Sequence, residues 1–489
     1  MEQTRDADRA TVIALTRFGL GPRPGDIERV RADPVGAVRA DLAEATLDLP
    51  TSAGLPDVEA ALGASRETRR WRRDMVQVVA DLDLLRQVSN PGTDAAASPD
   101  PAVMFARLGP SAPDGEDPGT GMVDVLYAPT LLSDEIDARI DRYLAAPVGF
   151  AERLVLFWSN HFAVGLKRDD LQVSVGALER EAIRPNVRGS FAGMLLAVAR
   201  HPGMLLYLDN DQSFGPNSPV GQKTGRGLNE NLARELLELH TLGVDGGYTQ
   251  ADVTSLACII TGWTISDRRG QGGFQFVPAR HEPGPQTVLG QEFPAGGVEQ
   301  GEAALVALTR HPATARHIAR KLASYFVADD PPPALVDRLA RVFRETDGDL
   351  GAVSRALVEA PEAWAAGPAK VRPPQEFLIA MMRLVGRQLR ASEFVSLSTT
   401  LGQPYWNAPA PNGFPTTSDA WISPKGMMDR VAVASRIAAR IPGNTEPAAL
   451  LAAAFGDTVS ESTTRAVMSA ESRNQAVAIL LMAPEFQWR

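Results

Sequence analysis

Histidines are the first side chains to consider for chemistry in this sequence, because an imidazole titrates near neutral pH and is the commonest metal ligand in proteins. The chain carries six of them. On a helical wheel through residues 149–162, His161 shares a face with Phe157 and Trp158, so we expect a buried imidazole. A packed core histidine with one hydrogen bond is one interpretation. A metal ion or a carboxylate that satisfies the second ring nitrogen is the other.

A second group of candidates lies on the helix expected after Asn229. Four charged residues fall within one arc of this helix, namely Glu230, Arg234, Glu235 and Glu238. His240 lies on the opposite, apolar face. A solvated stripe with an i,i+4 ion pair between Glu230 and Arg234 is one interpretation. Alternatively, these carboxylates could bind a metal ion, or one could act as a general base that the arginine orients.

The remaining histidines and the single cysteine differ in their settings. His281 lies in a loop directly after a predicted hairpin, and loops often carry functional residues, although a surface histidine is the alternative. His201 and His311 precede prolines at helix ends, and His317 lies on the polar side of its helix, so we expect structural or solvated roles. Cys258 has no histidine within helical reach and is predicted to be a core thiol.

These candidates combine into one hypothesis about function. We expect an enzyme that is a metal-dependent oxidoreductase or hydrolase, with a metal-free acid/base site as a variant. The catalytic group would be His161, Glu230, Arg234, Glu235 and His281. The metal ligands would be His161, Glu235, Glu238 and His281, which suit a divalent iron, manganese or zinc ion.

This hypothesis makes two demands on the structure. The ring of His161 should lie within about 8 Å of a carboxylate from the Glu230–Glu238 stripe, with His240 away from that stripe. The polar loop over residues 209–227 should border the same cavity, because it leads directly into that helix.

The elements that must position these residues are predicted to be helical. Apolar spacing follows the helical period along most of the chain, which indicates a mainly α, large multi-helix globular fold. One small β-hairpin insertion is expected near residues 263–278, where two β-prone runs flank a Gly-rich turn. We expect an N-terminal helical unit over 1–88, a flexible insertion over 89–127 and a main helical domain over 128–489.

Composition and absent motifs narrow the functional classes. The 489 residues are 44% hydrophobic and 22% charged, which is typical of a soluble globular protein. The net charge of −10 argues against nucleic acid as a partner, and one Cys excludes an intramolecular disulfide and Cys-rich metal sites. No export signal or membrane span is visible, so we expect a cytoplasmic protein. Phosphate-loop, G-x-S-x-G and H-E-x-x-H patterns are missing, and the small-molecule substrate is not indicated.

Several stretches, taken together, resemble one protein family. They are WSNHF at 158–162, NENLARELLELHTLGVDGGYTQADV at 229–253, TGW at 261–263 and HEPGPQTVLG at 281–290. In these stretches the sequence resembles the large bacterial family called domain of unknown function 1800. The resemblance spans nearly the whole chain. The chain departs from the family pattern at Glu282, where Asp is common, and at Gln286, where Lys is common.

The resemblance implies a partner rather than an activity. The family's activity is not established, but its members are often encoded beside a protein of unknown-function family 1501. A second interpretation follows, in which the chain is a non-catalytic scaffold or maturation partner of that protein, and its long loops are interaction surfaces.

Overall fold

The computed structural model of this protein describes residues 2–44, 47–50, 54–70, 73, 127–266, 272–365 and 369–489, with the backbone alone for residues 2–7. The insertion expected over 89–127 lies outside the described residues except for Tyr127. The division into three units therefore stays a prediction.

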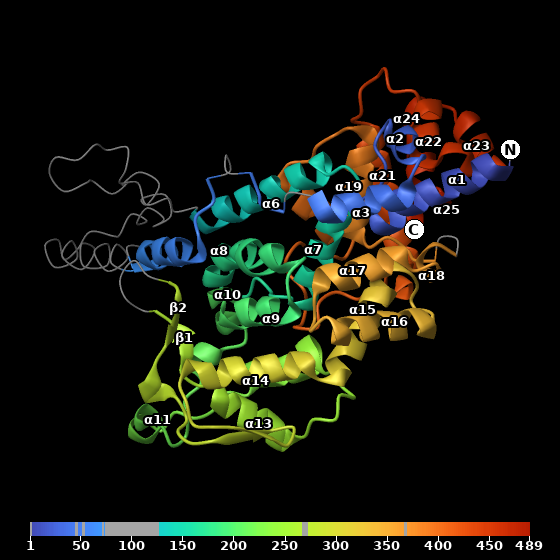
Figure 1. Cartoon of the computed structure of the whole chain (residues 1–489). Helices are drawn as coiled ribbons and strands as arrows, with labels where there is room; N and C mark the ends of the chain where they lie inside the picture. The colour runs from blue at the N-terminus through green and yellow to red at the C-terminus, as the bar shows by residue number, and fades with distance from the viewer. Residues whose placement is uncertain are drawn as a thin grey trace, which may run out of the picture.

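Helices dominate the described residues, as predicted (Figure 1). The N-terminal half contains α1 (Glu2–Ile13), η1 (Ala14–Phe18), α2 (Asp26–Val30), α3 (Pro34–Glu44), α6 (Tyr127–Ala145), α7 (Phe150–His161), α8 (Asp169–Leu178), η3 (Glu179–Ile183), η4 (Arg184–Asn186), α9 (Phe191–Arg200), α10 (Pro202–Tyr207), η5 (Asn210–Gln212), α11 (Pro219–Thr224), α12 (Asn231–Glu235) and η6 (Leu236–Thr241). Residues 58–70 are also helical. The segments η1, η3 and η6 are π-helical.

The C-terminal half continues the helical pattern. It contains α13 (Gln250–Ile259), η7 (Pro278–Arg280), α14 (Val298–Arg310), α15 (Pro312–Phe326), α16 (Pro333–Glu345), α17 (Leu350–Glu359), α18 (Glu362–Ala365), α19 (Pro374–Val385), α20 (Ala391–Thr400), η8 (Ser418–Trp421), α21 (Pro424–Ala438), α22 (Pro447–Phe455), η9 (Gly456–Thr458), α23 (Glu461–Met468), α24 (Arg473–Met482) and α25 (Pro484–Gln487). None of the helices in the described ranges has the length and apolar character that crossing a bilayer requires.

Two short antiparallel strand pairs interrupt the helices. The expected hairpin is confirmed as β1 (Trp263–Ile265) paired with β2 (Phe274–Phe276), in the register Trp263↔Phe276. A second pair, β3 (Gln286–Val288) with β4 (Gln291–Phe293), was not predicted. Its two-residue turn, Leu289-Gly290, has both φ angles positive, at 51° and 77°, as in the common hairpin turns. Leu is unusual at such a position, which hid the turn from the sequence pattern.

The buried apolar residues form two clusters that meet along α6. One cluster draws on the chain from Ile13 to Ala363, and the other gathers α19 to α25. Leu131 of α6 belongs to the first cluster, while Ile140 and Tyr143 of the same helix belong to the second. The first helix, α1, lies among the C-terminal helices (Figure 1). Segments distant in sequence therefore depend on each other for burial.

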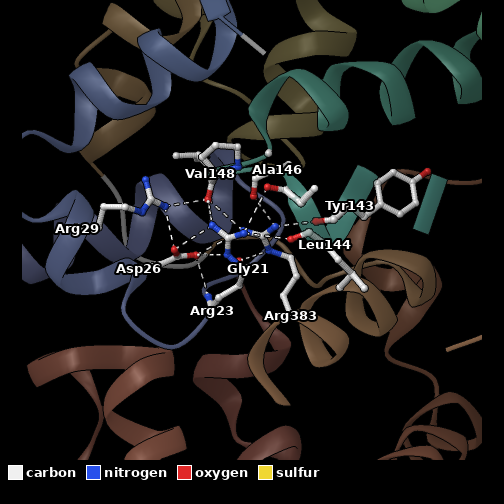
Figure 2. Close-up of polar contacts among 12 residues, drawn as sticks. Gly21, Arg23, Asp26, Arg29, Tyr143, Leu144, Ala146, Val148 and Arg383 are labelled. Carbon is white, nitrogen blue, oxygen red and sulfur yellow. Dashed lines mark hydrogen bonds and ion pairs between the residues drawn. The ribbon is translucent and has the colours of Figure 1, made fainter. Parts of the chain in front are cut away.

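A buried arginine links α19 to the N-terminal segment and to the end of α6. Figure 2 shows Arg383 of α19 in a cradle of backbone carbonyls. Its Nε donates to Gly21 O at 2.7 Å, and its Nη1 donates to the carbonyls of Tyr143 and Ala146, each at 2.7 Å. The carboxylate of Asp26 lies 3.5 Å from Nη2. Burial lowers the pKa of Arg383 to about 9, so this cradle holds a cation that has given up its water.

Candidate functional site

His161 lies at the last position of α7 and is buried, as predicted, with 2% of its surface exposed. Its ring packs edge-on against Trp158 and Phe162, with centroid distances of 5.3 and 4.5 Å. The apolar face of α7 therefore carries the imidazole into the core, where its ring nitrogens need partners.

The partners of His161 come from two other helical segments. Its Nε2–H donates to the carbonyl of His240 in η6 at 3.1 Å, and its Nδ1 lies 2.9 Å from Nζ of Lys321 in α15. His240 and His317 bring two more rings, with centroids 5.9 and 6.4 Å from that of His161. We call these four residues, His161, His240, His317 and Lys321, the lysine–histidine cluster.

The end of a helix explains why two imidazoles gather here. The last carbonyls of a helix have no intrahelical partner, and η6 presents two of them in succession. The carbonyl of Leu239 accepts from Nε2 of His317 at 3.1 Å, and the next carbonyl accepts from His161. Gly243, with a φ of 84°, ends the segment, and a Cβ there would lie 2.7 Å from Nδ1 of His317. Because it lacks a Cβ, Gly243 can adopt the positive φ of the turn and also leaves room for the ring of His317.

Hydrogen bonding fixes the tautomers of two of these rings. Because a carbonyl can only accept, Nε2 carries the proton in both His161 and His317, and Nδ1 is left with a lone pair. Burial, and then the nearby Lys321, lower the pKa of His161 well below its usual value. The same causes lower the pKa of His240 to about 3 and that of His317 to about 4. All three imidazoles are therefore neutral at physiological pH.

Lys321 is the unusual member of the cluster. Burial lowers its pKa to about 8, from a usual value of 10.5. Among the described carboxylates, none forms an ion pair with this amine, and its partner is the neutral Nδ1 of His161. A neutral imidazole stabilises an ammonium less than a carboxylate would. About a tenth of the amine is consequently unprotonated and nucleophilic at pH 7.

Ion pairs hold α7 in the position that this geometry needs. Glu152 accepts two hydrogen bonds from Arg184, each 2.9 Å long. Arg153 donates to the carbonyls of Thr16 and Gly19 and contacts Glu376. These groups are nearly fully buried, so their fixed partners restrict how α7 can rotate or slide. His161 is thereby presented in one orientation.

The lysine–histidine cluster borders a cavity of about 280 Å³. Its lining consists of Phe157, Asn160, His161, His317, Arg320, Lys321, Ser324 and Thr416. The walls include a nucleophile, a neutral base, hydroxyl groups and, at the mouth, the exposed Arg320. A pocket that gathers such groups around an amine of lowered pKa is a candidate active site.

The acidic stripe forms a separate arrangement. Glu230 pairs with Arg234 at 2.9 Å, as the i,i+4 spacing indicates, and also accepts hydrogen bonds from Gln250 and Thr254. These contacts lower the pKa of Glu230, the bonds from Thr254 and Gln250 most strongly. Glu238 accepts from Tyr248. Each of these carboxylates has a local partner, and His240 is buried away from the stripe, as predicted.

Glu235 differs from Glu230 in the direction of its pKa shift. Burial, with a contribution from Glu238, raises its pKa. Burial, and then the nearby Glu235, raise the pKa of Tyr207. Glu235 therefore faces α10, and none of its described interactions involves the lysine–histidine cluster.

His281 also lies apart from His161. It is buried rather than at the surface, with 7% of its surface exposed, and its Nδ1–H donates to Thr261 O at 3.0 Å. The adjacent Glu282 accepts from the backbone and side chain of Asn217, so the loop over residues 209–227 packs against this segment. Within the described ranges, His281 contacts Thr261 and Phe276, whereas the ring nitrogens of His161 contact His240 and Lys321.

The predicted site residues thus fall into three places. His161 belongs to the lysine–histidine cluster, the residues Glu230, Arg234, Glu235 and Glu238 to the stripe, and His281 to the loop beside Asn217. Across the described part of the chain, no three His, Cys, Asp or Glu side chains are grouped so that they could hold a metal ion. The proposed metal set and the approach of His161 to the stripe stay predictions, with no contact that supports them.

Sequence reasoning missed three members of the cluster. His317 was expected to be solvated on a polar face, yet it is half-buried and bonded to η6. One signal was available: His317 and Lys321 are four residues apart and so share a helix face. Lysine is also rare in this chain, which places Arg at most basic positions.

Comparison with known proteins gives one match. The model of a family described as protein of unknown function (DUF1800) matches residues 13–488. No curated protein and no solved structure matches the chain.

Proposed function

This chain belongs to the family of proteins of unknown function DUF1800, whose description names no activity, and we propose its function from the cavity. The proposed function is that of an enzyme that activates small aldehydes or ketones through an imine with Lys321. One observation carries the proposal. The Lys321 amine borders the cavity with the neutral Nδ1 of His161 as its partner, and no carboxylate of the described residues pairs with it. A desolvated lysine of this kind is a nucleophile toward carbonyl carbon.

The residues around Lys321 suit the steps of imine formation. The lone pair of the neutral amine forms a C–N bond to the carbonyl carbon, and the π electron pair of the carbonyl moves to its oxygen, which takes up a proton. Loss of water then gives the imine, so one carbonyl and one amine yield one imine and one water. His161 Nδ1, 2.9 Å from Nζ, is placed to accept the proton that nitrogen gives up and to return it to the departing hydroxyl.

Reductive trapping tests this proposal. The protein is incubated at about pH 7 with ethanal and cyanoborohydride, and the five lysines are compared by peptide mass spectrometry. A pKa near 8 leaves roughly 300-fold more neutral amine at Lys321 than at an ordinary lysine, so Lys321 should be alkylated first by about that factor. Lys425, which is exposed and paired with Asp429, provides the internal comparison. Equal labelling of the two lysines would refute the proposal.

The same experiment separates the other interpretations. A scaffold or maturation partner of a family 1501 protein has no use for a reactive lysine, and Lys321 would then be no more reactive than Lys425. A metal-dependent oxidoreductase or hydrolase remains a second proposal. The Nε2–H of His161 and that of His317 each donate to a carbonyl, which favours it, because metal-binding histidines commonly donate their other ring N–H in this way. Stoichiometric iron, manganese or zinc in the purified protein would support that reading.

A further inference from the structure

We infer that a second, apolar cavity beside the lysine–histidine cluster receives the hydrocarbon tail of the substrate, so that the substrate is a carbonyl compound with a short unbranched chain. This inference rests on the proposed function. The second cavity has a volume of about 80 Å³ and shares two lining residues, Asn160 and Thr416, with the cavity at Lys321. The two cavities therefore adjoin along Asn160 and Thr416, and the inferred path of the tail runs between these side chains.

The walls of the second cavity are apolar where they are free to contact a ligand. They include Leu156, Phe162, Val164, Val175, Leu178, Ile183, Ala408 and Phe414. Its charged groups already have partners: Glu179 accepts from Arg139, Arg184 and Ser159, while Glu376 pairs with Arg153 and Arg489. Burial of a charged or strongly polar substrate group here would leave that group without a partner. The cavity thus favours a hydrocarbon group.

The wall nearest Lys321 is held by a precise contact. The side-chain amide of Asn160 donates to Phe414 O at 3.0 Å, and its Oδ1 accepts from Phe414 N at 2.8 Å. Gly413 allows this approach, because a Cβ there would lie 2.4 Å from Asn160 O. Asn160 directly precedes His161 in α7, so the residue that fixes the aromatic wall is adjacent to the one that contacts the amine.

The volume limits the length of the tail. An apolar cavity of roughly 150 Å³ accommodates a benzene ring, so about 80 Å³ leaves room for a chain of about three carbon atoms. We therefore expect preferred substrates such as butanal, with the carbonyl carbon at Lys321 and the remaining carbons in the second cavity. Branched or aromatic carbonyl compounds of larger cross-section should react more slowly.

Trapping with a series of aldehydes tests the inference. Cyanoborohydride trapping at Lys321 is measured at low, equal concentrations of ethanal, propanal, butanal and octanal. Transfer of each methylene into an apolar site is expected to raise the trapping rate at Lys321 by about fourfold up to butanal, with no further rise for octanal. Lys425 reports the intrinsic reactivity of each aldehyde, and all rates are expressed relative to it.

A pair of variants locates the effect. Ala408→Leu places added carbon atoms in the second cavity and should bring the butanal-to-ethanal ratio at Lys321 close to one. Ala410→Leu, in the same loop but outside the lining, should keep the wild-type ratio. If ethanal is trapped at Lys321 but the wild-type rates do not rise with chain length, the inference is wrong and the proposed function stands. If no aldehyde is trapped preferentially at Lys321, both are wrong.

Discussion

Replacement of Lys321 with Met should abolish preferential imine trapping and, at neutral pH, stabilise the fold by about 1–2 kcal/mol. The lowered pKa of Lys321, about 8, corresponds to roughly 3 kcal/mol of unfavourable burial. The stabilisation expected for the variant is smaller than this for two reasons. The Lys321 side chain is partly exposed, and Met leaves His161 Nδ1 without its hydrogen-bond donor. Urea unfolding followed by circular dichroism measures the change in stability.

The stabilisation by Lys321→Met should also depend on pH in a defined direction. Below about pH 8 the amine is charged in both the folded and the unfolded chain, so the cost of burial is fully present. Between about pH 8 and 10.5 the folded chain releases the proton and the unfolded chain retains it, so the cost falls as pH rises. The advantage of the variant should therefore shrink from pH 7 toward pH 10. An advantage that stays constant would contradict the assigned cause.

Lys370 provides a matched control because it is the other buried lysine. Only 1% of its surface is exposed, but it pairs with Asp329 and donates to Thr416 O at 2.7 Å. Lys370→Met removes a partner from groups that are partly buried, and should destabilise the fold by about 1–3 kcal/mol. The two substitutions, identical in chemistry, should therefore have opposite effects. The same sign for both would mean that Lys321 has a partner that compensates its charge.

Arg383→Met should destabilise the protein by about 3–5 kcal/mol. The guanidinium is the hydrogen-bond donor for the carbonyls of Gly21, Tyr143 and Ala146, and Met offers none of them a donor. Because these carbonyls belong to the N-terminal segment and to the end of α6, loss of their donor should loosen the N-terminal segment from α19 (Figure 2). Urea unfolding measures the effect, and limited proteolysis near residues 21–25 should accelerate.

Arg387→Met is the control for this second prediction. Arg387 lies four residues after Arg383, just past the end of α19, and bonds to Glu393 at 3.1 Å, but its side chain retains 23% exposure. Exposed ion pairs of this kind contribute about 1 kcal/mol or less. If Arg383→Met lowers the free energy of unfolding by no more than Arg387→Met does, the prediction is wrong. This result would show that water satisfies the carbonyls of Gly21, Tyr143 and Ala146 when the guanidinium is removed.

Local patterns in the sequence were sufficient for much of the structure. The helical period predicted the mainly α fold, and the wheel through residues 149–162 placed His161 in the core. The ion pair of Glu230 with Arg234, expected from its i,i+4 spacing, is present. Each of these depends on residues within four positions of one another, where backbone geometry alone decides which side chains meet.

The candidate site required information that local patterns do not carry. Its members come from α7, η6 and α15, and their meeting depends on tertiary packing. The sequence around His240 predicts an ordinary helix, and nothing in it marks the π-helical turn that presents two carbonyls to histidines. The stripe carboxylates were the expected partners of His161, whereas its ring nitrogens contact a carbonyl and an amine.

The pKa of Lys321 in the intact protein tests the central claim most directly. Trace acetylation with acetic anhydride, carried out between about pH 6 and 11 and quantified for each lysine by mass spectrometry, gives the pKa from the dependence of rate on pH. We predict an inflection near pH 8 for Lys321, below the usual lysine value of 10.5. An inflection for Lys321 near pH 10.5 would contradict the account, because the amine would then be an ordinary ammonium at neutral pH.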